Sequence, residues 1–145
     1  MAITQAIANA FKKQLLEGDQ NFASGGDKFK LALYTSSATL NSATTAYTTS
    51  QEVGDSGAYS AGGGDLTGQN TSIASGVAIV DFADLSFTGV TLTARGALIY
   101  NTSSAVTNAA VAVLDFGADK TATSGTFTVQ FPAFTTAAAI LRISG

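Results

Sequence analysis

Residues 28–35 read Lys28-Phe29-Lys30-Leu31-Ala32-Leu33-Tyr34-Thr35, and large apolar side chains occupy every second position of the first six. A period of two is that of a β-strand with one face buried, so the stretch predicts that Phe29, Leu31 and Leu33 face a core. Four further strands are predicted at 76–82, 90–100, 109–116 and 126–131, with a fifth at 138–143. Turn-forming residues separate them, including those at 117–125, and Gly96 is expected to permit a bulge.

The first residues of the chain follow a different period. Ile3, Ile7, Phe11 and Leu15 recur at every fourth position, which predicts an amphipathic helix over 3–17. Thr4 is a candidate cap, and Gly18 stands where a left-handed residue ends a helix. Two roles remain open for this helix: packing on the domain's own sheet, or forming an arm that lies on a neighbouring molecule.

Many short strands after a single helix indicate a mainly β protein. We expect an antiparallel β-sandwich or jelly roll with an N-terminal amphipathic helix, formed as one domain over 1–145. Residues 1–18 form the helix or arm of this domain, and residues 36–76 form a long excursion of loops with short strands. Loops longer than about 12–15 residues are usually functional or ordered by a partner, so the excursion is a candidate contact surface.

Composition excludes several classes of function. The chain has no His and no Cys, so it lacks the usual proton shuttle at neutral pH and the thiolate nucleophile or metal ligand. Only 12% of its residues are charged, and the net charge of −3 argues against a nucleic-acid partner. Small neutral residues instead cover the surface, and such groups cost little to desolvate under another protein. No apolar stretch is long enough for a membrane span, and we expect synthesis in the cytoplasm.

Candidate ligand-binding motifs are weak. The loop Gly62-Gly63-Gly64 lacks the Lys and the following helix of a phosphate-binding loop. Asp81, Asp84, Asp115 and Asp119 have no calcium-loop spacing, and turn caps explain them more simply. We therefore expect no catalytic residue, no metal and no cofactor. Tyr47 and Tyr59 are the candidate platforms for a sugar, and as an alternative they anchor the loops or an interface.

Four segments of the chain stand out together: Phe29 to Thr35, Val80-Asp81-Phe82-Ala83-Asp84, Thr93 to Asn101, and Ala112-Val113-Leu114-Asp115-Phe116-Gly117. In their order and local sequence they resemble small virion structural proteins of tailed bacteriophages, and within that group the capsid cement (decoration) proteins. The resemblance implies a protein of the virion that binds the outer surface of an icosahedral capsid and braces neighbouring subunits. It also implies the major capsid protein as partner, and self-association as a dimer or trimer.

Two contact surfaces are candidates on this reading. One comprises the apolar residues of the expected helix, and the other comprises the region from Tyr47 to Gly64. Their residues are Ile3, Ile7, Phe11, Leu15, Tyr47, Tyr59, Gly62, Gly63 and Gly64. Two alternatives stay open: a structural component of the tail or connector, and a carbohydrate-binding adhesion module on the virion that uses Tyr47 and Tyr59.

Overall fold

The chain forms a mainly β structure with one short helix. A computed structural model describes residues 2–135 and 138–144. The elements are β1 (Ala6–Ile7), α1 (Asn9–Leu16), β2 (Phe29–Tyr34), β3 (Gly64–Asp65), β4 (Asn70–Ala74), β5 (Val77–Asp81), β6 (Leu85–Asn101), β7 (Ala109–Val129) and β8 (Leu141–Ile143). Strands predicted near β2, β5 and β8 are therefore present, and the excursion at 36–76 contributes only two short strands.

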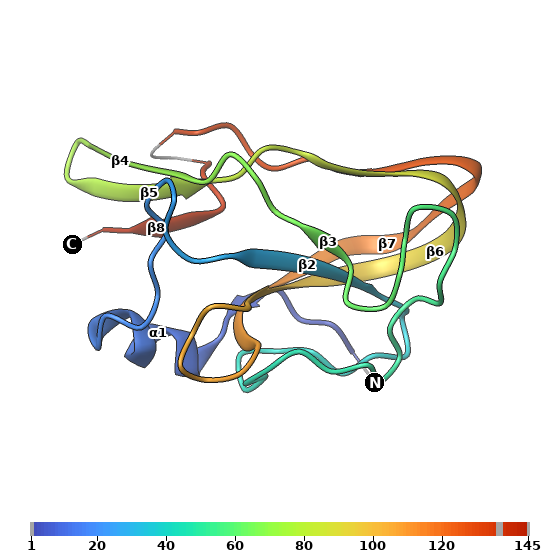
Figure 1. The fold of residues 1–145 in the computed structure, drawn as a ribbon, viewed down its shortest axis with the longest axis horizontal. Helices are drawn as coiled ribbons and strands as arrows, with labels where there is room; N and C mark the ends of the chain where they lie inside the picture. The colour runs from blue at the N-terminus through green and yellow to red at the C-terminus, as the bar shows by residue number, and fades with distance from the viewer. Residues whose placement is uncertain (1, 136–137, 145) are drawn as a thin grey trace.

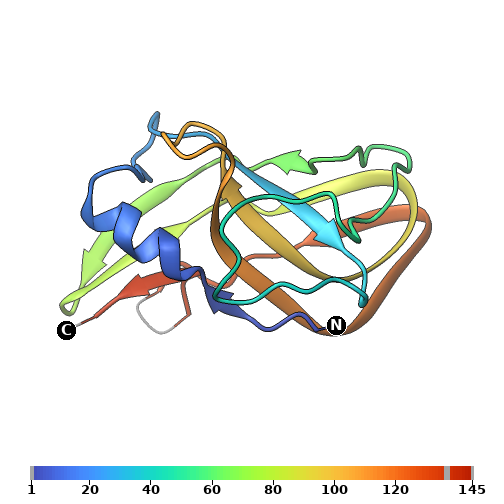
Figure 2. The same ribbon diagram turned by 90° about the horizontal axis from the view of Figure 1, so that it is seen from below.

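Two antiparallel sheets build the molecule. The larger has the order β1-β7-β6-β2-β3, and the smaller has the order β4-β5-β8 (Figure 1). The helix α1 lies near the smaller sheet, as the second view shows (Figure 2). The mainly β class is confirmed, and the two antiparallel sheets are consistent with a β-sandwich.

A long hairpin of β6 and β7 dominates the larger sheet. Its pairing runs from Leu85↔Val129 to Asn101↔Ala109, and four shifts of register interrupt it. Both strands bend strongly along their length, away from the loop that connects them, so that one part of the hairpin lies over β2 and β3 (Figure 1). One shift lies between Ala94 and Gly96, so the predicted bulge is confirmed. A Cβ added at Gly96 would lie 2.4 Å from a backbone oxygen of β7, so this close approach requires glycine.

The predicted break at 117–125 is wrong, because β7 continues through it. Gly117 and Ser124 have positive φ angles of 80° and 46°, which make local irregularities in the strand without ending it. Thr121, between these two residues, supports the pairing with β6, because its hydroxyl lies 2.8 Å from that of Thr93. Gly, Asp and Ser in this segment resemble a turn in composition, but the long partner strand keeps the ladder intact.

The predicted helix over 3–17 is also wrong in its first half. Residues 3–7 are extended: Ile3 bridges Leu40, and β1 pairs with β7. Side chains four residues apart share a face in a strand as well as in a helix, so the spacing of Ile3 and Ile7 does not distinguish the two. The N-cap of α1 is Ala8 and not Thr4. The end is as predicted, because Gly18 follows the helix with a φ of 77°.

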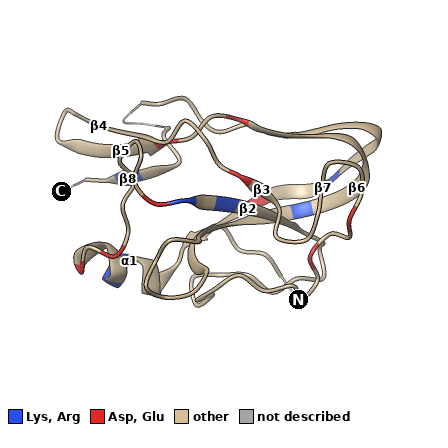
Figure 3. Cartoon of the chain, viewed as in Figure 1, with Lys and Arg blue, Asp and Glu red and all other residues tan. Residues whose placement is uncertain are grey.

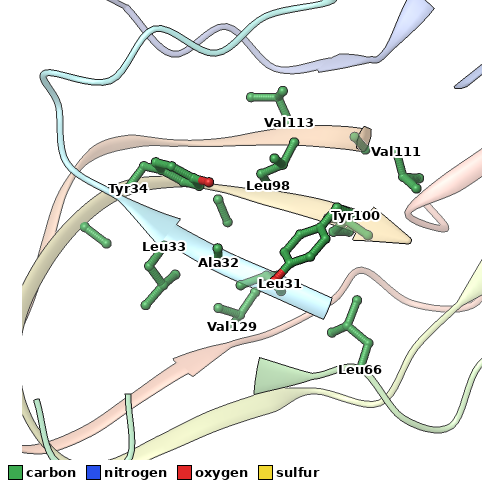
Figure 4. Close-up of a cluster of buried hydrophobic side chains, with 14 of the residues drawn as sticks. Leu31, Ala32, Leu33, Tyr34, Leu66, Leu98, Tyr100, Val111, Val113 and Val129 are labelled. Carbon is green, nitrogen blue, oxygen red and sulfur yellow. The ribbon is translucent and has the colours of Figure 1, made fainter. Parts of the chain in front are cut away.

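The core lies around β2, which is covered on both faces. Phe29, Leu31 and Leu33 are buried as predicted, and so are Ala32 and Tyr34 on the opposite face. Figure 4 shows Leu31, Ala32, Leu33 and Tyr34 of β2 among buried residues of β6 and β7. Phe22, from the link after α1, stacks on Phe29 with the ring centroids 4.5 Å apart. The strand is thus buried on both faces along most of its length, and not on the single face predicted; only Lys30 is partly exposed.

A buried asparagine organises the turn that joins β6 to β7. Asn101 is fully buried, and its Nδ2 donates hydrogen bonds of 2.8 Å to Gln20 Oε1 and to Asp27 Oδ2. Its Oδ1 accepts from the backbone N–H groups of Ser103 at 2.7 Å and Ser104 at 3.1 Å. All four polar contacts of this side chain are internal, so it fixes the turn to the link after α1.

Candidate functional site

Tyrosine side chains gather around one carboxylate in the excursion, that of Glu52. The hydroxyl of Tyr47 donates to Glu52 Oε1 at 2.5 Å, and the hydroxyl of Tyr59 donates to Oε2 at 2.7 Å. The backbone N–H of Gly62 donates to the same Oε2 at 2.7 Å. The ring of Tyr100 stacks on that of Tyr47, with centroids 4.8 Å apart. Three donors therefore satisfy this carboxylate. We call Glu52, its three donors and the stacked Tyr100 the tyrosine cluster.

The electrostatics of the cluster keep its phenols protonated. Burial, and next the negative charge of Glu52, raise the pKa of Tyr100 to about 12. The pKa of Tyr34 is raised by the same two causes. Burial is also the largest cause for Tyr47 and Tyr59, whose pKa values are raised further by their hydrogen bonds to Glu52. Near neutral pH the hydroxyls of Tyr47 and Tyr59 therefore stay protonated and donate to the Glu52 carboxylate.

Tyr59 connects the excursion to the edge of β2 that does not pair with β6. Its hydroxyl accepts a hydrogen bond of 2.8 Å from the backbone N–H of Leu33, and Val53 N–H donates to the Leu33 carbonyl at 2.9 Å. The excursion thus replaces a neighbouring strand where β3 no longer covers β2. The Tyr59 side chain is fully buried. In this conformation its ring is not accessible to a sugar or to another protein.

The three consecutive glycines serve close packing. A Cβ added at Gly63 would lie 1.8 Å from the carbonyl oxygen of Leu31, and its φ is 81°. Gly62 has a φ of 97°, and its carbonyl accepts a 2.6 Å hydrogen bond from the hydroxyl of Tyr100. Gly64 begins β3, which pairs with β2. The glycines therefore allow the backbone to lie directly against β2. Glu52, which accepts from the Gly62 N–H, was not among the residues predicted from the sequence.

The N-terminal candidates divide between the core and a groove. Ile3 and Phe11 are buried in the core, whereas Ile7 and Leu15 are partly buried against it. Ile7, Phe11 and Leu15 also line one wall of an apolar groove of about 340 Å³. The smaller sheet supplies the opposite wall, with residues that include Ile143. Most of the expected helical contact surface is therefore used inside the chain, and what remains open is this groove.

Exposed apolar side chains were not identified from the sequence. The largest are Leu16, Ile73, Ile143 and Val106, which are 89%, 73%, 58% and 45% exposed. Ile73 pairs with Ala78 and Ala78 pairs with Ile143, so the three share one face of the smaller sheet. Ile73 is the only large apolar residue in 67–76, a signal that marks it as unusual but not as exposed. Clustered exposed apolar groups are typical of protein contact surfaces.

The four candidate acidic residues do not form a site. Asp84 Oδ1 accepts a 2.9 Å hydrogen bond from the N–H of Phe131, and Asp115 Oδ1 lies 3.5 Å from Arg95 Nε. Asp81 lies in β5 and Asp119 in β7, in different sheets. Within residues 2–135 and 138–144, no group of three or more His, Cys, Asp or Glu side chains is placed to hold a metal ion.

In the part of the chain that the structure describes, no helix has the length and apolar character needed to cross a membrane. No protein-family model, curated protein or solved structure matches the chain.

Proposed function

We propose that the chain is a structural virion protein that binds the outer surface of an icosahedral phage capsid and braces neighbouring capsid subunits. The observation that carries the proposal is the apolar groove between α1 and the smaller sheet. Ile143 lies in its lining, and Ile73 extends the same face of the sheet. Surfaces of this kind are favourable to bury against another protein.

The charge distribution supports a protein partner. Few charged residues lie on the ribbon, and they are scattered along the chain (Figure 3). Interface cores are depleted of charged residues, because removing an unpaired charge from water costs free energy. A dimer or trimer of this chain would engage several equivalent contacts of a shell at once, and such linked contacts attach more strongly than single ones. A protein that binds only one form of the capsid shell would stabilise that form by mass action.

The finer parts of the proposal follow the resemblance. The partner is the major capsid protein, the chain assembles as a dimer or trimer, and its sandwich is of the jelly-roll type. The tyrosine cluster has a supporting role in this scheme: it holds the excursion rigid, so that a contact made there loses little conformational entropy. A structural component of the tail or connector is the alternative that the same surface features would serve.

The copy number per particle tests the proposal. Quantitative mass spectrometry of purified virions would give the ratio of this chain to the major capsid protein. We expect hundreds of copies in a simple ratio to the capsid subunit. A handful of copies would assign the chain to the tail or connector, and absence from the particles would refute a virion role.

A further inference from the structure

β4 is the longest of the four strands that border the two sheets in the described residues. It borders the smaller sheet, and all five of its residues are exposed. The other border strands of the described residues, β1, β3 and β8, have two, two and three residues. Natural proteins protect exposed edges with charges, Pro or bulges. β8 contains Arg142 and β3 contains Asp65, whereas Asn70–Ala74 has no such residue and pairs with β5 without a register shift.

The turn between β4 and β5 fixes the hydrogen-bonding pattern of the hairpin. Ser75 and Gly76 form the two-residue loop, with φ angles of 50° and 76°. Two positive φ angles are the requirement of a type I′ turn. In such a hairpin the flanking pair, here Ala74 and Val77, is hydrogen-bonded, and the pairs then alternate along the strands.

The alternation directs the backbone groups of Thr71 and Ile73 away from β5. Both residues belong to the pairs that exchange no hydrogen bonds within the hairpin, so their N–H and C=O groups lie on the free edge. The Thr71 N–H agrees with this assignment, because it donates to the side-chain oxygen of Asn70 at 2.9 Å. The edge thus offers two residues with outward donors and acceptors, on either side of Ser72.

We propose that β4 pairs antiparallel with β4 of a second copy of this chain, across a two-fold axis at Ser72. In this register Thr71 lies opposite Ile73 of the second copy, and Ile73 lies opposite its Thr71. Each of these pairs joins two residues with outward backbone groups, so both can form their hydrogen bonds. Thr and Ile are β-branched residues, which suit neighbouring positions across a ladder. The two smaller sheets then form one continuous sheet.

Charge and apolar surface favour a second copy over a charged peptide. Each copy has a net charge of −3, but residues 66–80 contain no charged side chain, so the contact brings no like charges together. The row Ile73, Ala78 and Ile143 also continues across the axis into Thr71, Val80 and Leu141 of the second copy. Because Ala78 and Ile143 line the apolar groove, pairing joins the grooves of both copies into one surface.

This inference makes specific the self-association that is part of the proposed function, but its test needs no capsid. The chain has no Cys, so a single introduced thiol reports one position only. Ser72→Cys would place two thiols opposite each other in a pair without hydrogen bonds, where the Cα atoms lie about 4.5 Å apart and a disulfide can form. We expect mild oxidation of the purified variant to give a covalent dimer.

Matched variants test the register. Asn70→Cys and Ala74→Cys alone should stay monomeric on oxidation, because each lies far from its own equivalent, whereas a mixture of the two should cross-link. Equal cross-linking of all single variants, or none with Ser72→Cys, would overturn the proposal. Failure here would leave the capsid proposal untouched, since the copy number in virions decides that separately.

A pair of charge variants tests the association without thiols. Ile73→Lys places two cations near the axis and should abolish the dimer in sedimentation velocity, leaving the 14.6 kDa monomer. Ile143→Lys makes the same change on the same face but on β8, and should leave the dimer intact. Circular dichroism confirms that both variants are folded. A monomeric unmodified chain at millimolar concentration, or equal effects of both variants, would refute the pairing.

Discussion

The hydroxyl of Tyr59 bridges Glu52 and Leu33: it donates to the Glu52 carboxylate at 2.7 Å and accepts from the Leu33 N–H at 2.8 Å. One buried atom therefore connects a charged group of the excursion with the backbone of β2. Loss of that atom would leave a buried donor and a carboxylate with fewer partners, which is costly away from water. The bridge makes the excursion part of the folded core and not a detachable loop.

Tyr59→Phe should therefore lower the free energy of unfolding by about 1–3 kcal/mol, the usual cost of leaving a buried polar group without its partner. Urea denaturation of the variant and the unmodified chain measures the difference. Tyr47→Phe is the matched control, because its hydroxyl donates to the same carboxylate and its side chain is less buried than that of Tyr59. Equal losses for both variants would contradict a special role of the Leu33 contact.

Alkaline pH should unfold the chain as the tyrosines ionise. The pKa of Tyr100 is raised from 10.0 to about 12, so the folded state holds its proton more tightly than the unfolded state. This contribution to stability is complete below pH 10 and is lost as the pH rises towards 12. Tyrosinate absorbance and circular dichroism should change together. Ionisation of all tyrosines near pH 10, without loss of structure, would contradict the expectation.

Gly63→Ala should destabilise the chain more than Gly25→Ala. Both glycines have a positive φ, near 80°, so both variants carry the strain of a left-handed Ala, about 1–2 kcal/mol. Only at Gly63 would the new Cβ meet the backbone, because nothing lies within 4 Å of the same position at Gly25. The free energies of unfolding from urea titration provide the comparison, and equal values would refute the close approach of Gly63 to β2.

Leu16→Lys should weaken attachment to capsid shells with little effect on stability. Leu16 is 89% exposed, and substitutions at such positions change stability by no more than about 0.5 kcal/mol. Shells that lack this chain can be incubated with each variant and the bound fraction measured after sedimentation. Thr123→Lys, on an exposed position of β7, adds the same charge elsewhere. Equal binding by both variants would exclude the end of α1 from the contact.

The sequence predicted those parts of the fold that a single local pattern determines, such as an alternation of side chains or a glycine at a turn. The alternation at Phe29 to Leu33, the left-handed residue Gly18 and the bulge at Gly96 are confirmed. Each depends on a period or on glycine's freedom, which the sequence displays directly. The start of α1 and the continuity of β7 were predicted wrongly, because tertiary pairing overrode the local pattern.

The candidate site could be predicted only in part. Tyr47, Tyr59 and Gly62 lie together, but they do so because all three donate hydrogen bonds to Glu52 of the same chain. No local spacing identifies this carboxylate, since its donors lie five, seven and ten residues away. The one signal was its isolation: Glu52 is the only acidic or basic residue in 31–54. An ionisable group alone among aromatic residues needs partners that only the folded chain supplies.

The position of β6 has a consequence for synthesis on the ribosome. β2 emerges early, but its only long neighbour is the second half of β6, and β6 in turn pairs along its length with β7. Closing the short loop between Asn101 and Ala109 costs the least chain entropy, so the hairpin forms from that end once β7 has left the exit tunnel. The larger sheet can therefore assemble only after β7, which ends at Val129, has been translated, so β2 is made well before its long neighbours are complete.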